Sequence, residues 1–98
     1  MPLEVLALQY RAVYGTHDIR VQKTSLVHRM QYGLSIDGVK HDQLDALGGT
    51  FSLHGVLKEA DAVLPVEIIV RQGFFTGRYE CRVAGAHVPL ERIRHGRR

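Results

Sequence analysis

The fold is decided most clearly by the stretch Val63–Val83, which reads VLPVEIIVRQGFFTGRYECRV. One face of its first half gathers three β-branched residues, Val66, Ile68 and Val70. Its second half alternates between inward and outward positions, and the inward ones are Tyr79, Cys81 and Val83. Because the glycine-bounded segment 73–77 separates the two halves, the sequence predicts a β-hairpin at this point.

Two more hairpins are predicted upstream of this stretch. Asp37-Gly38 lies between alternating runs, and this dipeptide is the strongest short hairpin signal because both central residues of a type I′ turn need positive φ. A period of two over residues 6–14 and 19–23, on either side of the turn-forming segment 15–18, predicts the other hairpin. A helix over residues 4–13 is the rival interpretation, since Glu, Leu, Ala and Gln all favour helices.

The rest of the chain adds shorter elements. We expect one helical turn over residues 42–47, a strand over 50–57 and a short edge strand over 88–90. Turn signals then recur roughly every 8–14 residues, a spacing that is typical of small β-proteins. The sequence therefore predicts an all-β fold, a small antiparallel β-sandwich or open barrel of about seven short strands joined by hairpins.

The charge is divided between a neutral body and a basic tail. The formal net charge is +3, yet residues 1–91 hold 9 of the 13 Lys and Arg and all 10 Asp and Glu. The four remaining positive charges are Arg92, Arg94, Arg97 and Arg98. We expect a single β-domain over residues 1–91, large enough to fold without metal or disulfide staples, and a disordered basic tail over residues 92–98.

Composition and the N-terminal segment favour a soluble, cytoplasmic protein. The one cysteine, Cys81, cannot form an internal disulfide, whereas small secreted domains usually rely on several. Residues 1–8 carry Glu4 where a signal peptide would carry basic residues. No stretch approaches the about 20 apolar residues that span a bilayer, so we expect no membrane partner.

No pattern of residues points to catalysis, a metal or a cofactor. The chain has six histidines, but none has the spacing of a zinc motif. His41, Asp42 and Asp45 form one local cluster, for which a solvated turn is the favoured interpretation. Cys81 falls at an inward strand position, where a small core side chain is favoured over a reactive thiol. We therefore expect no enzyme activity, no cofactor and no metal site.

Two features of the sequence are candidate interaction sites. Phe74 and Phe75 share one hairpin loop, where at most one of them easily points into the core, so the other is a candidate interface anchor together with Arg78 and Tyr79. The rival interpretation is that the loop folds back and caps the end of the sandwich. The basic tail is the second feature, because its arginines can contact phosphates while the loop aromatics stack on single-stranded bases.

These features favour a non-enzymatic protein-interaction or binding module of unknown partner. A homodimer through an exposed edge strand is one form of such binding, because neither terminal strand carries the dense Lys or Pro that discourage edge pairing. Nucleic-acid binding through the arginine-rich tail and the Phe74/Phe75 loop is the alternative. A small-molecule site inside a barrel ranks last, because a chain of this size leaves little interior empty.

The order of these features resembles the Fas apoptotic inhibitory molecule family over about residues 16–92. The resemblance lies in five segments of this chain, Thr16–Val21, Tyr32–Lys40, Phe51–Gly55, Val66–Val70 and Gly73–Gly85. It implies an antiparallel β-sandwich that is not an enzyme and acts through contacts with other proteins. The chain departs from the family pattern in having no Trp, where the family usually carries one after the Asp-Gly hairpin.

Overall fold

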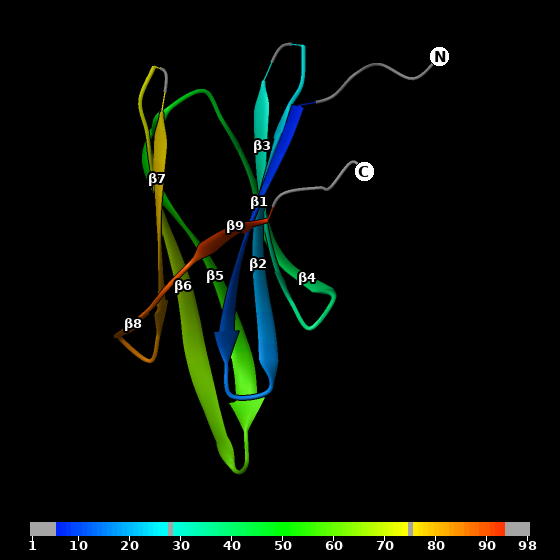
Figure 1. Ribbon diagram of the computed structural model, residues 1–98, viewed down its shortest axis with the longest axis vertical. Coiled ribbons are helices and arrows are strands. Elements are labelled where there is room, and N and C mark those ends of the chain that lie inside the picture. The colour runs from blue at the N-terminus through cyan, green and yellow to red at the C-terminus, as the bar shows by residue number, and fades with distance from the viewer. Residues whose placement is uncertain (1–5, 28, 75, 94–98) are drawn as a thin grey trace.

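The computed structural model describes residues 6–27, 29–74 and 76–93, and in these ranges it has nine strands and no helix. The strands form two antiparallel sheets (Figure 1). Sheet A contains, in spatial order, β4 (Val39–Ala46), β3 (Met30–Ile36), β2 (His17–Ser25), β1 (Leu6–Tyr14) and β9 (Glu91–Ile93). Sheet B contains β5 (Gly49–Glu59), β6 (Ala62–Gln72), β7 (Gly77–Val83) and β8 (Ala86–Val88). The predicted all-β fold is confirmed, and residues 6–14 form a strand.

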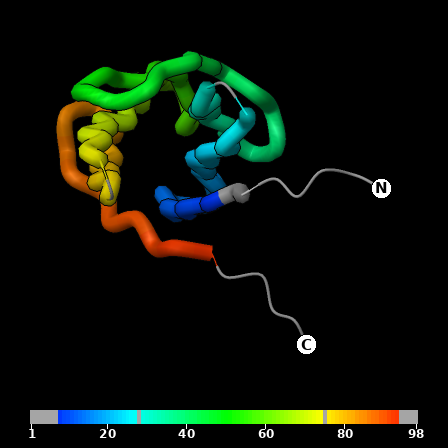
Figure 2. The backbone as a smooth tube through the Cα atoms, turned by 90° about the horizontal axis from the view of Figure 1, so that it is seen from above, coloured from blue at the N-terminus to red at the C-terminus, as the bar shows by residue number. Residues whose placement is uncertain are grey.

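The chain passes between the sheets twice. It leaves sheet A after β4, through Leu47 and Gly48, and it returns after β8, through Pro89 and Leu90. The view from above shows these two crossings on opposite sides of the molecule (Figure 2). The two sheets together therefore form a flattened, incompletely closed barrel.

Two of the turns have the backbone that their sequences predict. Asp37 and Gly38 have φ of 52° and 82°, and Ala84 and Gly85 have φ of 51° and 84°. Two successive positive φ values give the turn a twist that matches the right-handed twist of the flanking strands. The β3–β4 and β7–β8 hairpins are therefore determined by local sequence.

The core consists of the inward positions of both sheets. Its most deeply buried members come from β2, β3, β5, β6 and β7, and they include Ile19, Val21, Tyr32, Leu34, Leu53, Ile68 and Val70, all 0% exposed. They pack together in a single apolar cluster. The alternation of apolar and polar residues along each strand places them there.

Cys81 lies in this core with no exposed surface. Burial raises the pKa of its thiol to about 11, because a low-dielectric environment disfavours the thiolate. Its predicted role as a small core side chain is confirmed, since a reactive thiol needs exposure and a lowered pKa.

The helical turn expected over residues 42–47 is wrong, because this segment continues β4. Strand β4 pairs with β3 on both sides of a bulge between Leu34 and Ser35. The Asp42 carboxylate also accepts a 2.7 Å hydrogen bond from the backbone N–H of His54, on the edge of β5. The ladder with β3 and the hydrogen bond to β5 outweigh the local helical preference of the segment, because tertiary contacts override intrinsic propensity.

The C-terminal expectations also need correction. The short strand expected over residues 88–90 lies two residues earlier, as β8 (Ala86–Val88). Pro89 and Leu90 form the crossing to β9. Arg92 belongs to β9, where it pairs with Tyr10, so the domain extends past the boundary predicted at residue 91. The described residues form nine strands, where about seven were expected, and β9 is a strand that the sequence did not predict. Residues 94–98 of the predicted tail lie outside the described residues.

Candidate interaction site at the loop end of the sandwich

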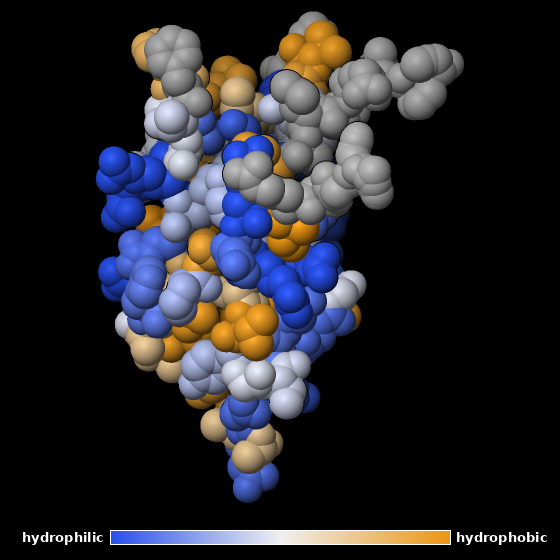
Figure 3. All heavy atoms as spheres, viewed as in Figure 1, coloured by the Kyte–Doolittle hydropathy of each residue, from blue (hydrophilic) through white to orange (hydrophobic). Residues whose placement is uncertain are grey.

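One end of the sandwich, which we call the loop end, carries the β2–β3, β4–β5 and β6–β7 connections (Figure 1). Each connection exposes a large apolar side chain: Val27 is 78% exposed, Leu47 is 75% exposed and Phe74 is 98% exposed. Hydrophobic residues are visible at this upper end in the space-filling view (Figure 3). Single exposed apolar residues are common on protein surfaces, but three at one end mark a candidate interaction surface.

Two of these apolar residues border a shallow pocket of about 300 Å³. Leu47 and Phe74 form its sides, and three glycines, Gly48, Gly49 and Gly73, line it as well. Because glycine has no side chain, the backbone of both connections is accessible between the two apolar residues. We call this the apolar pocket.

A second pocket of about 340 Å³ adjoins the first and shares Gly49, Gln72 and Gly73 with it. Its other lining residues are Thr50, Arg71, Thr76 and Arg78. Both arginines are exposed, and they are direct partners across the β6–β7 ladder. We call this the arginine pocket. Together the two pockets form a groove that is apolar at one end and cationic at the other.

Gln72 holds the base of this groove in place. It is the buried polar residue of the described chain, 7% exposed. Its Oε1 accepts hydrogen bonds from Tyr32 Oη at 3.1 Å and Lys23 Nζ at 3.2 Å. Its Nε2 donates to the carbonyls of Gly73 at 3.1 Å and Thr76 at 3.3 Å. The amide therefore ties the β6–β7 loop to both sheets.

Gly77 is required beside this amide. A Cβ atom at residue 77 would lie 2.6 Å from Gln72 Oε1 and 3.3 Å from the ring of Tyr79. Such a contact is too short for van der Waals packing, so any larger residue would displace the amide. The glycine at the start of β7 thus has a packing role as well as a turn role.

Tyr79 faces the interior rather than the loop surface. Its ring stacks on Tyr10 with centroids 4.5 Å apart, and its hydroxyl is buried without a hydrogen-bond partner among the described residues. Burial raises the pKa of Tyr79 far above its ordinary value. Tyr79 is thus partly buried against the core, and its predicted role in partner binding stays a prediction.

The other predicted site residues fall in two places. Phe74 and Arg78 come together at the groove, and Phe75 lies outside the described residues. Arg92 lies in β9 of the other sheet, and Arg94, Arg97 and Arg98 are not among the described residues. Of the four arginines of the predicted tail, the structure therefore describes Arg92 alone, on β9 beside β1.

Leu47, Arg71 and Gln72 complete the groove, and sequence patterns did not single out Leu47 or Gln72 as site residues. One signal for Gln72 was present: it continues the inward series Val66, Ile68 and Val70 in β6, and a polar residue at an inward position needs hydrogen-bond partners. Leu47 had no comparable signal, because only the β4–β5 crossing brings it near Phe74.

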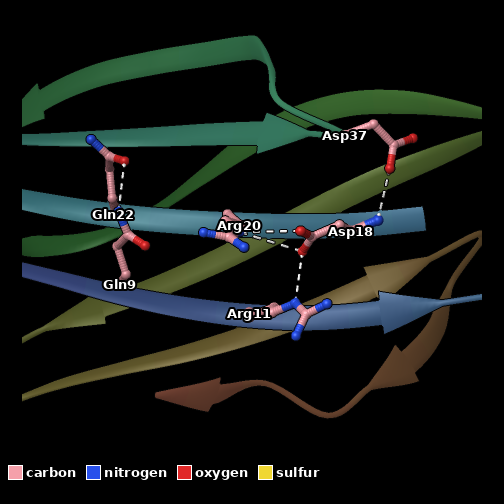
Figure 4. Close-up of polar contacts among 6 residues, drawn as sticks. All are labelled: Gln9, Arg11, Asp18, Arg20, Gln22 and Asp37. Carbon is pink, nitrogen blue, oxygen red and sulfur yellow. Dashed lines mark hydrogen bonds and ion pairs between the residues drawn. The ribbon is translucent and has the colours of Figure 1, made fainter. Parts of the chain in front are cut away.

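The opposite end of the sandwich carries a polar cluster around Asp18 and Asp37. Asp18 accepts from Arg11 Nε at 3.0 Å and from Arg20 Nε at 3.2 Å, and its backbone N–H donates to Asp37 at 2.9 Å (Figure 4). His17 Nδ1 donates to the other Asp37 oxygen at 2.7 Å. These contacts bind β1 and β2 to the β3–β4 turn.

His17 also connects the two sheets at that end. Its Nε2 lies 3.7 Å from the Glu59 carboxylate of β5, and its side chain is only 16% exposed. The hydrogen bond to Asp37 and the charges of Asp37 and Glu59 raise the pKa of His17, although burial opposes this shift. Hydrogen bonds from the Asp18 backbone and His17 lower the pKa of Asp37.

These shifts predict how stability depends on pH. Because the folded-state pKa of His17 is raised above about 6.5, its contribution is complete below that pH and disappears as pH rises through the raised value. The contribution of Asp37, whose pKa is lowered from about 3.9, is complete above that pH and disappears on acidification. The two contributions are therefore both complete between about pH 3.9 and 6.5.

Urea denaturation of the wild type and of Asp37→Asn at about pH 5.5 and pH 8.5 tests this dependence. We expect the stability difference between the two proteins to be larger at the lower pH, where His17 is charged. A His17 side-chain NMR titration should show a pKa above its ordinary value in the wild type and a lower one in the variant. An equal stability difference at both pH values would contradict the assignment.

Among the described residues, no group of three or more His, Cys, Asp and Glu is placed to hold a metal ion. The sequence cluster of His41, Asp42 and Asp45 lies along strand β4, where Asp42 binds the His54 backbone instead. The described residues also contain no helix that is long and apolar enough to cross a membrane.

Comparison with known proteins finds no match: no family model, no curated protein and no solved structure corresponds to this chain. The resemblance to the Fas apoptotic inhibitory molecule family therefore rests on the sequence patterns alone.

Proposed function

We propose that this protein is a non-enzymatic protein-interaction module that binds its partner in the groove at the loop end. The observation that carries the proposal is Phe74, a large aromatic residue that is 98% exposed beside a pocket. Exposed aromatic residues at the centre of a surface patch are frequent anchors of protein interfaces. Leu47, 75% exposed on the facing connection, adds apolar surface to the same pocket.

The position of the groove supports the same function. Loops at the end of a β-sandwich commonly carry binding residues, because the sheets hold them in place while their sequences vary freely. Gln72 links this loop to Tyr32 and Lys23 of sheet A, which limits the ordering that binding would require. A pre-organised site loses less conformational entropy when a partner binds.

The two alternatives from the sequence remain predictions with less support. Edge-strand pairing needs a free edge. Strands β8 and β9 have 3 residues each and Asp42 occupies a donor on the edge of β5, which leaves the 8-residue edge strand β4 for such pairing. Nucleic-acid binding was expected to combine the tail with the Phe74 loop, whereas Arg92 lies in the other sheet.

Selection from a displayed library of random peptides of about twelve residues tests the proposal. We expect peptides selected on the wild type to lose at least about tenfold in affinity to Phe74→Ser, because an interface anchor contributes more than about 1.4 kcal/mol. Val63→Ser is the matched control, since Val63 is 58% exposed on β6. It should leave binding unchanged. The proposal fails if no peptide is selected, or if the selected peptides bind Phe74→Ser as well as the wild type.

A further inference from the structure

The arginine pocket contains two like charges that the fold places directly opposite each other. Arg71 of β6 and Arg78 of β7 are ladder partners, and side chains at such positions start about 5 Å apart. Like charges at directly opposed positions destabilise a sheet. Their presence together therefore calls for a compensating negative charge.

The described residues supply that compensation only in part. Glu80 lies 3.6 Å from Arg71, but its closer contact is the 2.9 Å ion pair with Arg82. Arg78 forms no ion pair with any described carboxylate. Arg78 is thus available to an anion from outside, and Arg71, which shares Glu80 with Arg82, lies beside it. Arginine binds carboxylate and phosphate oxygens through paired N–H donors.

The surroundings of the two arginines limit the kind of anion. Thr50 and Thr76 line the same pocket, and a threonine hydroxyl can donate a further hydrogen bond to oxygen. The apolar pocket between Leu47 and Phe74 adjoins it and shares Gly49 and Gly73. A ligand that occupies both pockets carries an oxyanion and, next to it, a large apolar group.

We infer that the groove recognises a peptide segment in which a carboxylate or phosphate group stands beside a large apolar side chain. Arg71 and Arg78 bind the oxyanion, and Leu47 and Phe74 contact the apolar side chain. This inference rests on the proposed function and adds the chemistry of the partner. A peptide from a partner protein supplies both groups on neighbouring residues. The carboxylate comes from Asp or Glu, and the phosphate comes from a phosphorylated residue.

Four fluorescent peptide pools test the inference by anisotropy. Each pool has leucine at one position, random residues at its ends, and Glu, phosphoserine, Gln or Lys beside the leucine. We expect the Glu or the phosphoserine pool to bind the wild type at least about tenfold more tightly than the Gln and Lys pools, as charge-assisted hydrogen bonds to arginine predict. The tighter of the two pools identifies the source of the oxyanion. Inorganic phosphate should compete only if the phosphate group is the main determinant.

Matched variants assign the effect to the groove. Arg78→Glu should abolish the preference for acidic pools, and Arg78→Gln should reduce it. Lys58→Glu, with the same change of charge on the exposed surface of β5, should keep it. Gly73→Leu should weaken binding of all pools by filling the groove, since a Cβ atom there meets its nearest neighbour at an ordinary 3.5 Å. Thermal unfolding of each variant shows whether it retains the fold.

The outcomes separate this inference from the proposed function. If all pools bind equally and Phe74→Ser weakens them all, the interaction site stands and the oxyanion preference is overturned. If no pool binds, or Phe74→Ser has no effect, both are overturned. The inference would be overturned in favour of nucleic acid if a single-stranded oligonucleotide bound the wild type more tightly than every peptide pool and lost this binding in Arg78→Glu.

Discussion

Replacement of Tyr32 by alanine is expected to lower the free energy of unfolding by about 3–5 kcal/mol, the range for deleting a large aromatic side chain from a core. Tyr32 is 0% exposed and is among the largest buried side chains. Its ring meets Phe51 edge to face with centroids 4.7 Å apart, which joins sheet A to sheet B. A small domain has only about 5–15 kcal/mol of stability in total, so this change should leave it marginal.

Equilibrium urea denaturation followed by tyrosine fluorescence and by far-ultraviolet circular dichroism measures the effect. Tyr32→Phe is the comparison, because it keeps the ring and removes only the hydroxyl that donates to Gln72 at 3.1 Å. We expect this smaller change to cost about 1 kcal/mol. A midpoint for Tyr32→Ala equal to that of Tyr32→Phe would show that the ring does not hold the sheets together.

Replacement of Gln72 by leucine is expected to lower stability by about 1–3 kcal/mol and to weaken peptide binding as well. Leucine has a similar volume, so little cavity forms, but four hydrogen bonds are removed. The Gly73 carbonyl then loses the hydrogen bond from Nε2, and the buried Tyr32 hydroxyl keeps only its weak contact with Met30 Sδ at 3.7 Å. An unsatisfied buried polar group carries the whole desolvation cost, which is the main source of the expected loss.

The matched control is Gln22→Leu, because Gln22 is an exposed glutamine of β2 whose amide, among the described residues, makes one side-chain hydrogen bond, accepted from Gln9 at 3.5 Å. Its effect on stability should stay within about 0.5 kcal/mol. Hydrogen exchange of the Gly73 amide, which donates to the Thr76 carbonyl at 2.9 Å, reports on the loop directly. We expect faster exchange in Gln72→Leu and unchanged exchange in Gln22→Leu. Equal stabilities of the two variants would remove Gln72 from its role as the anchor of the groove.

Some features of the candidate site follow from local sequence, and others depend on residues that are distant in the chain. The sequence predicted that at most one of Phe74 and Phe75 easily points inward, but it did not specify which of them is exposed, and a loop that caps the sandwich stayed open as the rival interpretation. Tyr79 alternates inward with Cys81 and Val83, and the structure packs it, partly buried, against the core. The opposition of Arg71 and Arg78 depends on the register of β6 with β7, which an intervening loop of unknown shape leaves open.

By itself the sequence determined the elements whose causes are local. Period-two alternation specified the strands and the core, and Asp37-Gly38 specified a hairpin, because pleat geometry and positive φ act within a few residues. Only the tertiary structure decided β4 beyond His41, the crossing to β9, and the meeting of Leu47 with Phe74 and of Gln72 with Tyr32. These features depend on contacts between residues far apart in the chain, whose formation follows from the packing of the two sheets as a whole and leaves little trace in any short segment.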